Sequence, residues 1–267
     1  MLIERLLAAI TFHYDEARLG YLQKVCLQIP SLGFDYKVLI VTNAKDESAH
    51  QKIRDQLGYF SNFEIVPYPV MGHPFFLTWG HLPLFKRYHE TDPNYSHFMY
   101  LEDDIQVTAR NVNYWLRGRH ELTNYGLYPS FVRYEINHTN DKVATDITKP
   151  LKLKILPKIS VTPEYIFINS PQPYQGMYIM DRSMMYEYFN SVACSPDFGD
   201  WGIREKATQG LTFFNVPKSF LSRNLIGYNL SQKAIDPDAL IEHLPGNYAN
   251  NPESQFGKLH LENLITS

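Results

Sequence analysis

Blocks of apolar residues alternate with amphipathic segments over the first hundred positions of the chain. Strand-like apolar runs cover residues 6–13, 36–43, 63–69 and 96–104. The segments between them, residues 15–29, 46–58 and 77–90, carry apolar side chains at helical spacing, although Pro83 interrupts the last one. This alternation of strands and helices predicts an α/β fold with a mainly parallel sheet flanked by helices.

The second half of the chain is less regular. Its predicted elements are a helix at residues 111–125, strands at 129–137 and 174–181, and helices at 182–191 and 200–210. Residues 138–170 are rich in Lys, Thr and Pro and suit a hairpin with a mobile loop. Neither a repeat nor a linker separates the two halves. We therefore expect one domain over residues 1–267, made of one half at 1–110 and an irregular half at 111–267.

Charge and composition exclude some classes of function. The 267 residues carry a net charge of −3 without a long basic run, which argues against a nucleic-acid-binding protein. No stretch approaches the ~20 consecutive apolar residues of a membrane-spanning helix, so no transmembrane segment is expected. Cys26 and Cys194 have no metal or redox spacing and are expected to be reduced. These features favour the cytoplasm, with the protein free or attached to a membrane surface, although a chain trimmed of its anchor would look the same.

Three consecutive acids, Glu102, Asp103 and Asp104, close the strand predicted at residues 96–104. Adjacent buried carboxylates repel each other, so they need a cation or a raised pKa. Oxygen ligands suit Mg²⁺ or Mn²⁺, which take one or two protein carboxylates and complete their shell with water and substrate phosphates. The chain has no glycine-rich phosphate loop, so metal and side chains would have to hold the phosphates. The alternative is a solvated cluster, or one that caps the next helix.

The acidic motif resembles the D-x-D signature of GT-A glycosyltransferases. The three-acid form "EDD", followed by "IQVTARNVNYW", is similar to the N-acetylglucosaminyltransferase I group. Downstream, "PDFGDWGIRE" at residues 196–205 is similar to that group's Trp-Asp-Asp-Trp-x-x-Arg segment and aligns Asp200, Trp201 and Arg204. The first Trp of the family segment is Phe198 or Gly199 here. Only the acidic motif and the Asp-Trp pair match sharply.

The resemblance implies a GT-A fold and a metal-dependent glycosyltransferase of hexosyl or N-acetylhexosaminyl type. Such an enzyme moves a sugar from a nucleotide-sugar, here expected to be UDP-linked, to a glycan or another hydroxyl acceptor, as in polysaccharide biosynthesis. It implies that Asp104 contacts the Mn²⁺ or Mg²⁺ ion, that Glu102 and Asp103 contact the ribose or the donor sugar, and that Asp200 is the catalytic base. A base on the far face of the sugar gives inversion.

Each residue of the downstream segment also has an alternative reading. Asp200 has rivals for the base in Asp197 and Glu205, and it can instead be the N-cap of the helix predicted at 200–210, in which case retention is open. Trp201 either forms the floor of an acceptor site or packs in the core. Arg204 either binds the acceptor or a phosphate, or pairs with a neighbouring acid.

His243 near the C-terminus is a further candidate. Some GT-A enzymes use a C-terminal His as a metal ligand, although the N-acetylglucosaminyltransferase I group does not rely on it. The alternative for His243 is a structural histidine.

Polar residues also follow the first two predicted strands. Thr11, His13, Tyr14 and Arg18 surround the first strand–helix turn, where GT-A enzymes hold the nucleotide base, and Asn43 ends the second strand. Ligands of parallel sheets bind beyond the carboxyl ends of the strands, so all five are expected to bind the donor. The alternative is an ordinary polar turn.

Two other functions compete with glycosyl transfer. A nucleotidyltransferase would share the sheet and the acidic site, but it usually carries a glycine-rich, basic loop after the first strand, and "HYDEARLGYL" lacks one. A non-catalytic carbohydrate-binding protein could keep the fold and lose the base; retention of both the acids and Asp200 counts against it.

Overall fold

The computed structural model describes residues 3–69 and 72–266 and divides into two compact units. The first unit contains the chain up to Thr108 together with Gly176–Gly210, and the second contains Ala109–Gln175 together with the residues from Leu211 onward. The segment Gly176–Gly210, which the sequence analysis assigned to the second half, thus belongs to the first unit. The expectation of a single domain over the whole chain stays a prediction.

The first unit is built on one twisted sheet. Its strands are β1 (Arg5–Phe12), β2 (Asp35–Thr42), β3 (Phe63–Pro67), β4 (His97–Glu102) and β12 (Met177–Asp181), and the short β5 (Ile105–Gln106) follows β4. The order across the sheet is β12-β4-β1-β2-β3, and β12 alone among these runs antiparallel to its neighbour. The predicted α/β fold with a mainly parallel sheet is confirmed.

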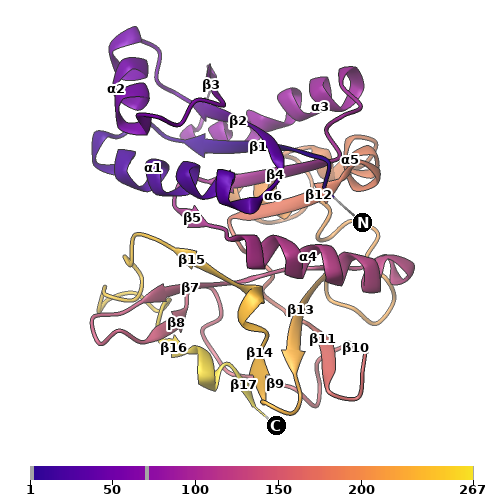
Figure 1. Cartoon of the computed structure of the whole chain (residues 1–267). Coiled ribbons are helices and arrows are strands. Elements are labelled where there is room, and N and C mark those ends of the chain that lie inside the picture. The colour runs from indigo at the N-terminus through magenta and orange to yellow at the C-terminus, as the bar shows by residue number, and fades with distance from the viewer. Residues whose placement is uncertain (1–2, 70–71, 267) are drawn as a thin grey trace. The chain divides into compact units, whose positions relative to one another are not determined.

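Helices flank this sheet (Figure 1). They are α1 (Leu19–Gln28), α2 (Glu47–Leu57), α3 (His81–Thr91), α5 (Arg182–Phe189) and α6 (Ile203–Gln209), with 3-10 turns η1 (Glu16–Arg18), η2 (Ile29–Leu32), η3 (Pro74–Trp79) and η5 (Val192–Cys194). Helices α1 and α2 contact each other, while α3 contacts α5 and β1. Right-handed crossovers explain this pairing, because the strand order reverses between β3 and β4 and sends α3 to the opposite face.

Local sequence determines where these helices begin and end. The Asp46 side chain accepts a hydrogen bond from the Ala49 amide at 2.8 Å and so caps α2. The helix ends at Leu57 and is followed by Gly58 with a φ of +57°. Pro83 does not interrupt α3, contrary to expectation. The helix begins at His81, so Pro83 falls in the first turn, where its missing N–H would have no partner within the helix.

The second unit combines one long helix with short strands. Its elements are α4 (Ala109–Leu122), β6 (Tyr128–Pro129), β7 (Val132–Ile136), β8 (Lys142–Ala144), β9 (Leu151–Lys152), β10 (Lys158–Ser160), β11 (Tyr165–Asn169), β13 (Asn224–Asn229), β14 (Ala234–Ile235), β15 (Leu240–His243), β16 (Leu259–His260) and β17 (Ile265–Thr266), with 3-10 turns η4 (Thr123–Tyr125), η6 (Pro237–Ala239) and η7 (Leu261–Asn263). One sheet has the order β10-β11-β13-β14, and another contains β16-β8-β7-β15. The hydroxyl of Tyr114 on α4 accepts a hydrogen bond from the Gly227 amide at 2.9 Å and donates to the Ser130 carbonyl at 3.1 Å, which fastens the helix to β13.

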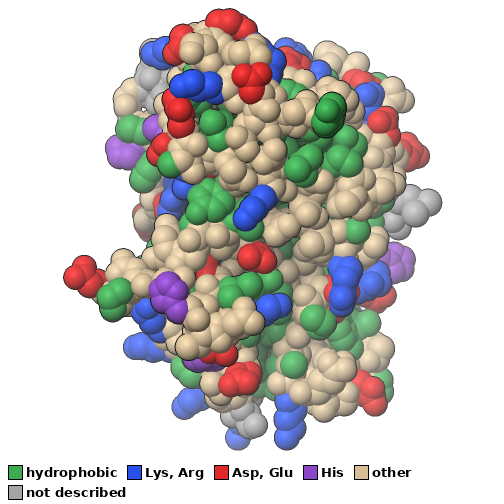
Figure 2. Space-filling model, turned by 60° about the vertical axis from the view of Figure 1, so that its left-hand side comes forward, with side chains coloured by type: hydrophobic (Ala, Val, Ile, Leu, Met, Phe, Trp, Pro, Cys, Tyr) green, Lys and Arg blue, Asp and Glu red, His purple; other side chains and the backbone are tan. Residues whose placement is uncertain are grey.

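Charges of both signs are interspersed over the face drawn in Figure 2, without a continuous basic field. No helix within residues 3–69 and 72–266 is long and apolar enough to cross a membrane.

Candidate functional site

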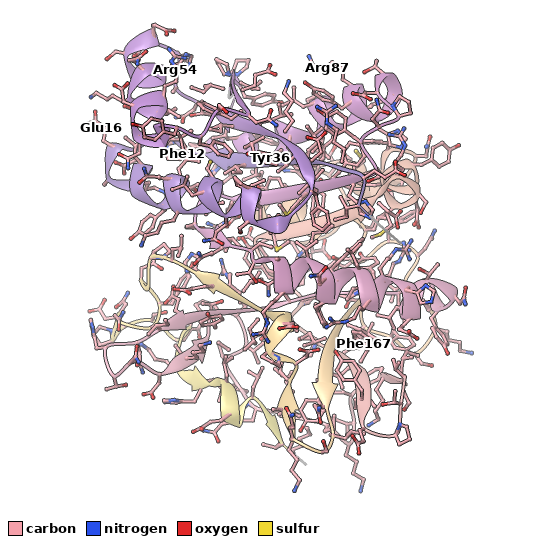
Figure 3. The ribbon with its side chains drawn as sticks, in the orientation of Figure 1. Phe12, Glu16, Tyr36, Arg54, Arg87 and Phe167 are labelled. Carbon is pink, nitrogen blue, oxygen red and sulfur yellow. The ribbon has the colours of Figure 1, made fainter. Side chains whose placement is uncertain are left out.

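The carboxyl ends of the parallel strands bring the predicted donor residues to one edge of the first unit. In the strand register Thr11 of β1 lies opposite Glu102 of β4, and Phe12 lies opposite Thr42 of β2. Phe12 is fully buried at this edge, and Glu16 in the following turn lies on the surface (Figure 3). Residues that are distant in sequence are therefore neighbours here, as expected for ligand sites of parallel sheets.

The three acids at the end of β4 are all buried. Glu102, Asp103 and Asp104 are 8%, 5% and 6% exposed. Arg18, at the end of η1, lies against two of them. Its Nε donates to Asp103 Oδ2 at 3.0 Å, and its Nη2 donates to Asp103 Oδ1 at 2.9 Å and to Asp104 Oδ2 at 2.7 Å. One guanidinium thus holds two neighbouring carboxylates, an interaction for which its forked geometry is well suited.

Burial has the largest effect on the pKa of Asp103. It raises the pKa of Asp103 to about 7; Arg18 opposes this rise, and the neighbouring charge of Asp104 adds to it. Asp103 and Asp104 together raise the pKa of Arg18 further above its already high ordinary value, against the effect of burial. The guanidinium therefore stays charged, whereas burial disfavours the ionised form of Asp103.

The backbone at Gly176, directly before β12, lies close to Glu102. The Glu102 amide donates to the Gly176 carbonyl at 3.1 Å. Gly176 has a φ of +66°, and a Cβ at this position would lie 3.1 Å from Ile105 Cγ1 and 3.2 Å from Glu102 Oε2. Glycine is therefore required here both by the backbone conformation and by the space beside Glu102.

The downstream Asp-Trp segment meets the acidic motif within the same unit. Arg204 Nε lies 3.9 Å from Glu102 Oε1, and Arg204 Nη2 lies 3.3 Å from Glu205 Oε1. The guanidinium also lies 5.5 Å from the ring centre of Phe75 in η3. The Trp79 indole donates to the Ile203 carbonyl at 2.9 Å, which fixes the start of α6 on η3. The predicted pairing of Arg204 with a neighbouring acid is confirmed, and its binding of acceptor or phosphate stays a prediction.

The structure corrects the alternative role of Asp200 as a helix cap. Helix α6 begins at Ile203, and its N-cap is Gly202, without a side-chain hydrogen bond. A Cβ on Gly202 would lie 2.2 Å from Glu205 Oε2, because the Glu205 side chain folds back over this position. Asp200 is exposed, two residues before the cap. Its carboxylate is therefore accessible to a ligand, and its role as a base stays a prediction.

Trp201 is 42% exposed, which excludes the alternative that it packs in the core. A partly exposed indole next to Asp200 offers a surface on which an apolar sugar face can stack. Its role as the floor of an acceptor site stays a prediction.

The first strand–helix turn is organised around Asn43. The Asn43 side-chain oxygen accepts from the Tyr14 amide at 2.7 Å, and its amide nitrogen lies 3.4 Å from His13 Nε2. Tyr14 packs edge-on against Phe12 with ring centres 6.0 Å apart. His13 is exposed, whereas Thr11 is buried. Asn43 thus holds the turn that carries His13 and Tyr14, and donor binding by these residues stays a prediction.

A buried aromatic and histidine cluster beneath the acidic edge was missed by the sequence reasoning. Tyr100, two residues before Glu102, stacks on Tyr178 of β12 with ring centres 5.5 Å apart. His81 Nε2 lies 2.6 Å from the Tyr178 hydroxyl, and its Nδ1 lies 2.6 Å from the Thr78 carbonyl. Complete burial lowers the pKa of His81 to about 3, so the ring is neutral. All six residues of β4 are buried, and the partners of Tyr100 come from distant segments, so no local pattern distinguished this cluster.

His243, the second predicted metal ligand, belongs to the second unit. Its Nδ1 lies 2.5 Å from Glu135 Oε1, and Glu135 also accepts from the amides of Tyr248 at 3.0 Å and Ala249 at 2.6 Å. This pairing is a structural role. A carboxylate on one ring nitrogen is also typical of metal-binding histidines, so metal binding by His243 stays a prediction.

The acidic edge fits a hard divalent cation by its chemistry. Buried carboxylate oxygens are the ligands that Mg²⁺ and Mn²⁺ prefer, and these ions need only one or two from the protein. Among residues 3–69 and 72–266, no group of three or more His, Cys, Asp and Glu side chains has a geometry that could hold a metal on its own.

Comparison with known proteins gives structural likenesses at low identity. No protein-family model matches the chain, and no curated protein matches its sequence. The fold is similar to GalNAc-T7 crystallised with UDP, GalNAc and Mn²⁺, at 10% identity and a TM-score of 0.47, over 91% of this chain and 43% of that one. It is also similar to TarS of S. aureus, at 10% identity and a TM-score of 0.42, over 91% and 61%. A third is the 4-diphosphocytidyl-2C-methyl-D-erythritol synthase of Anaerococcus prevotii, at 13% identity and a TM-score of 0.36, over 76% and 81%. This chain thus spans less than two thirds of GalNAc-T7 and of TarS.

Proposed function

We propose that the protein is a metal-dependent glycosyltransferase of the GT-A type that moves a sugar from a UDP-sugar to a glycan or another hydroxyl acceptor. The observation that carries this proposal is the contact between Glu102 and Arg204. It brings the Asp-Trp segment beside the buried acids in one compact unit. A metal–diphosphate on the acids and a base at Asp200, four residues before Arg204, would then share one site.

The donor half of the site follows from the strand ends. Asp104 would ligate Mn²⁺ or Mg²⁺, and the two oxygens of Asp103 would accept hydrogen bonds from the ribose hydroxyls. His13 and Tyr14 would contact the base, with their turn held by Asn43. When bound, the metal neutralises the charge that develops on the leaving diphosphate.

The acceptor half is the exposed Asp200–Trp201 pair. The sugar of the acceptor would stack on Trp201, and Asp200 would take the proton from its attacking hydroxyl. The acceptor oxygen forms a bond to the anomeric carbon while the bond from that carbon to the phosphate oxygen breaks, and the nucleoside diphosphate leaves. A single displacement of this kind inverts the anomeric centre. Glu205 is a poorer base, because it is engaged with Arg204.

We also propose a cytoplasmic location. Cys26 and Cys194 are both free thiols, as is usual in reducing compartments.

The test is a transfer assay that compares Asp200→Asn with a matched control. Asp197 is also exposed and lies in the same segment, so Asp197→Asn makes the same chemical change three residues away. With UDP-sugars, Mn²⁺ and a panel of glycan acceptors, Asp200→Asn should retain UDP binding and lose transfer by about 10²-fold or more, the usual effect of removing a general base. Asp197→Asn should transfer normally. Near-normal transfer by Asp200→Asn would show that another group is the base, and release of pyrophosphate from a nucleoside triphosphate would instead indicate nucleotidyl transfer.

A further inference from the structure

Arg18 occupies the oxygens that the proposed ligands need. Asp103 uses both of its carboxylate oxygens to accept from Arg18, and Asp104 accepts through Oδ2. The proposed function assigns the Asp103 oxygens to ribose hydroxyls and Asp104 to the metal. The guanidinium thus occupies the positions that the ribose hydroxyls and the metal would take.

The guanidinium and the metal compete at Asp104. Arg18 Nη2 lies 2.7 Å from Asp104 Oδ2. A Mg²⁺ ion on the same oxygen would lie at about 2.1 Å from it, which would bring the ion to roughly 4 Å from the guanidinium nitrogen. Repulsion between a divalent ion and a guanidinium at this distance in a partly buried site weakens the Arg18–Asp104 pair, so the two cations compete for this carboxylate.

Arg18 can leave without a change in the backbone. Its side chain is 31% exposed, so the guanidinium borders solvent. Its backbone amide donates to the Asp15 carbonyl at 3.0 Å, and the Asp15 side chain caps the same turn through the Ala17 amide at 2.9 Å. The turn is therefore held by its own hydrogen bonds, and rotation of the side chain alone releases the carboxylates.

We propose that Arg18 is the resident counter-cation of the Asp103–Asp104 pair and is exchanged for the incoming metal and nucleotide, as its guanidinium moves from the carboxylates to the diphosphate. This inference rests on the proposed function. Metal alone displaces Arg18 without offering it a new partner, whereas a diphosphate offers a bidentate one. Metal and nucleoside diphosphate therefore bind cooperatively, and Arg18 selects nucleoside diphosphates over nucleosides.

The experiment is a calorimetric titration of Mn²⁺ alone into the wild type, Arg18→Gln and Arg18→Lys. Arg54→Gln is the matched control, because Arg54 lies on α2 in an exposed pair with Glu47 and its replacement changes the net charge equally (Figure 3). Arg18→Gln should bind Mn²⁺ about tenfold more tightly than the wild type or more, within the usual range for coupled sites. Arg18→Lys keeps the charge but loses the fork, and it should also bind more tightly than the wild type. Arg54→Gln should bind as the wild type does.

A second titration measures the exchange itself. With saturating Mn²⁺, the affinity for UDP should fall in Arg18→Gln, and the loss should be absent when uridine replaces UDP. Mn²⁺ should also raise the unfolding temperature of Arg18→Gln more than that of the wild type. If Arg18→Gln does not fold, Arg18→Lys alone decides both titrations.

Equal or weaker Mn²⁺ affinity in both Arg18 variants would overturn the proposal, and so would a lack of Mn²⁺ binding by every protein in the set. If the wild type still binds UDP only with metal, the proposed function stands and only the exchange by Arg18 is refuted. If no nucleotide binds the wild type under any condition, the proposed function itself is refuted, and the exchange onto a diphosphate is refuted with it.

Discussion

Asp103 should make the stability of the first unit depend on pH near neutrality. Burial raises the pKa of its carboxyl from 3.8 to about 7. An acid whose pKa is higher in the folded state than in the unfolded state contributes stability that is fully present below its unfolded pKa. This stability is lost as pH rises through its folded pKa. The window therefore runs from about pH 4 to about pH 7, and the complete change corresponds to about 4 kcal/mol in the free energy of unfolding. About 2–3 kcal/mol of it falls between pH 5 and pH 8.

Urea unfolding at pH 5 and pH 8 measures this contribution in the wild type and in Asp103→Asn. The variant removes the titrating group and keeps an oxygen that can accept from Arg18. Buried Trp79 in the first unit provides a fluorescence signal. From pH 5 to pH 8 the wild type should lose about 2–3 kcal/mol more than Asp103→Asn. Asp197→Asn, which alters an exposed carboxylate of the same unit, should behave as the wild type does. The same pH dependence in wild type and Asp103→Asn would refute the argument.

Three further predictions concern the surroundings of the site. Gly176→Ala should lower the free energy of unfolding by about 1–2 kcal/mol because of its left-handed backbone, and it should weaken UDP binding because the new Cβ would crowd Glu102. The control is Gly58→Ala, at φ +57° with open space around it, which should affect stability alone. Equal UDP binding by both variants would contradict this prediction. His81 is buried and neutral with its pKa lowered to about 3, so the unfolded chain takes up a proton on this residue before the folded protein does as pH falls below about 6.5. This difference removes about 4 kcal/mol from the free energy of unfolding by pH 3. His81→Gln should flatten this acid loss in urea unfolding, and an unchanged slope would contradict it. Trp201→Ala should raise the KM for the acceptor while changing stability by at most about 0.5 kcal/mol, as for an exposed position; an unchanged KM would exclude Trp201 from the acceptor site.

The sequence located the carboxyl edge of the first sheet because the signals for this edge are local. Apolar runs that end in polar residues located the carboxyl ends of β1, β2 and β4, and the α/β pattern implied that these ends share one edge. Arg18 was predicted at this edge, but its pairing with Asp103 and Asp104 was not. That pairing depends on the direction of a long side chain, which no local pattern encodes.

Other features depend on contacts between distant segments. Strand β12 pairs antiparallel with β4 although many residues separate them. The sequence order therefore assigned Gly176–Gly210 to the second half, whereas this segment belongs to the first unit. The start of α6 was expected at Asp200, but the helix begins only at Ile203, where Trp79 holds its first turn. The short strands of residues 138–170 were expected only as a hairpin and a mobile loop, because strands of two or three residues carry too little periodicity to be recognised.

Metal-dependent nucleotide binding tests the central claim most directly. The wild type and Asp104→Ala are titrated calorimetrically with UDP, GDP and CMP, each with and without Mn²⁺. The account predicts that UDP binds the wild type in the presence of Mn²⁺, that binding disappears without the metal, and that it disappears in Asp104→Ala. No binding of any nucleotide, or binding that is the same without Mn²⁺ and in Asp104→Ala, would contradict the account and leave the acidic edge with a structural role.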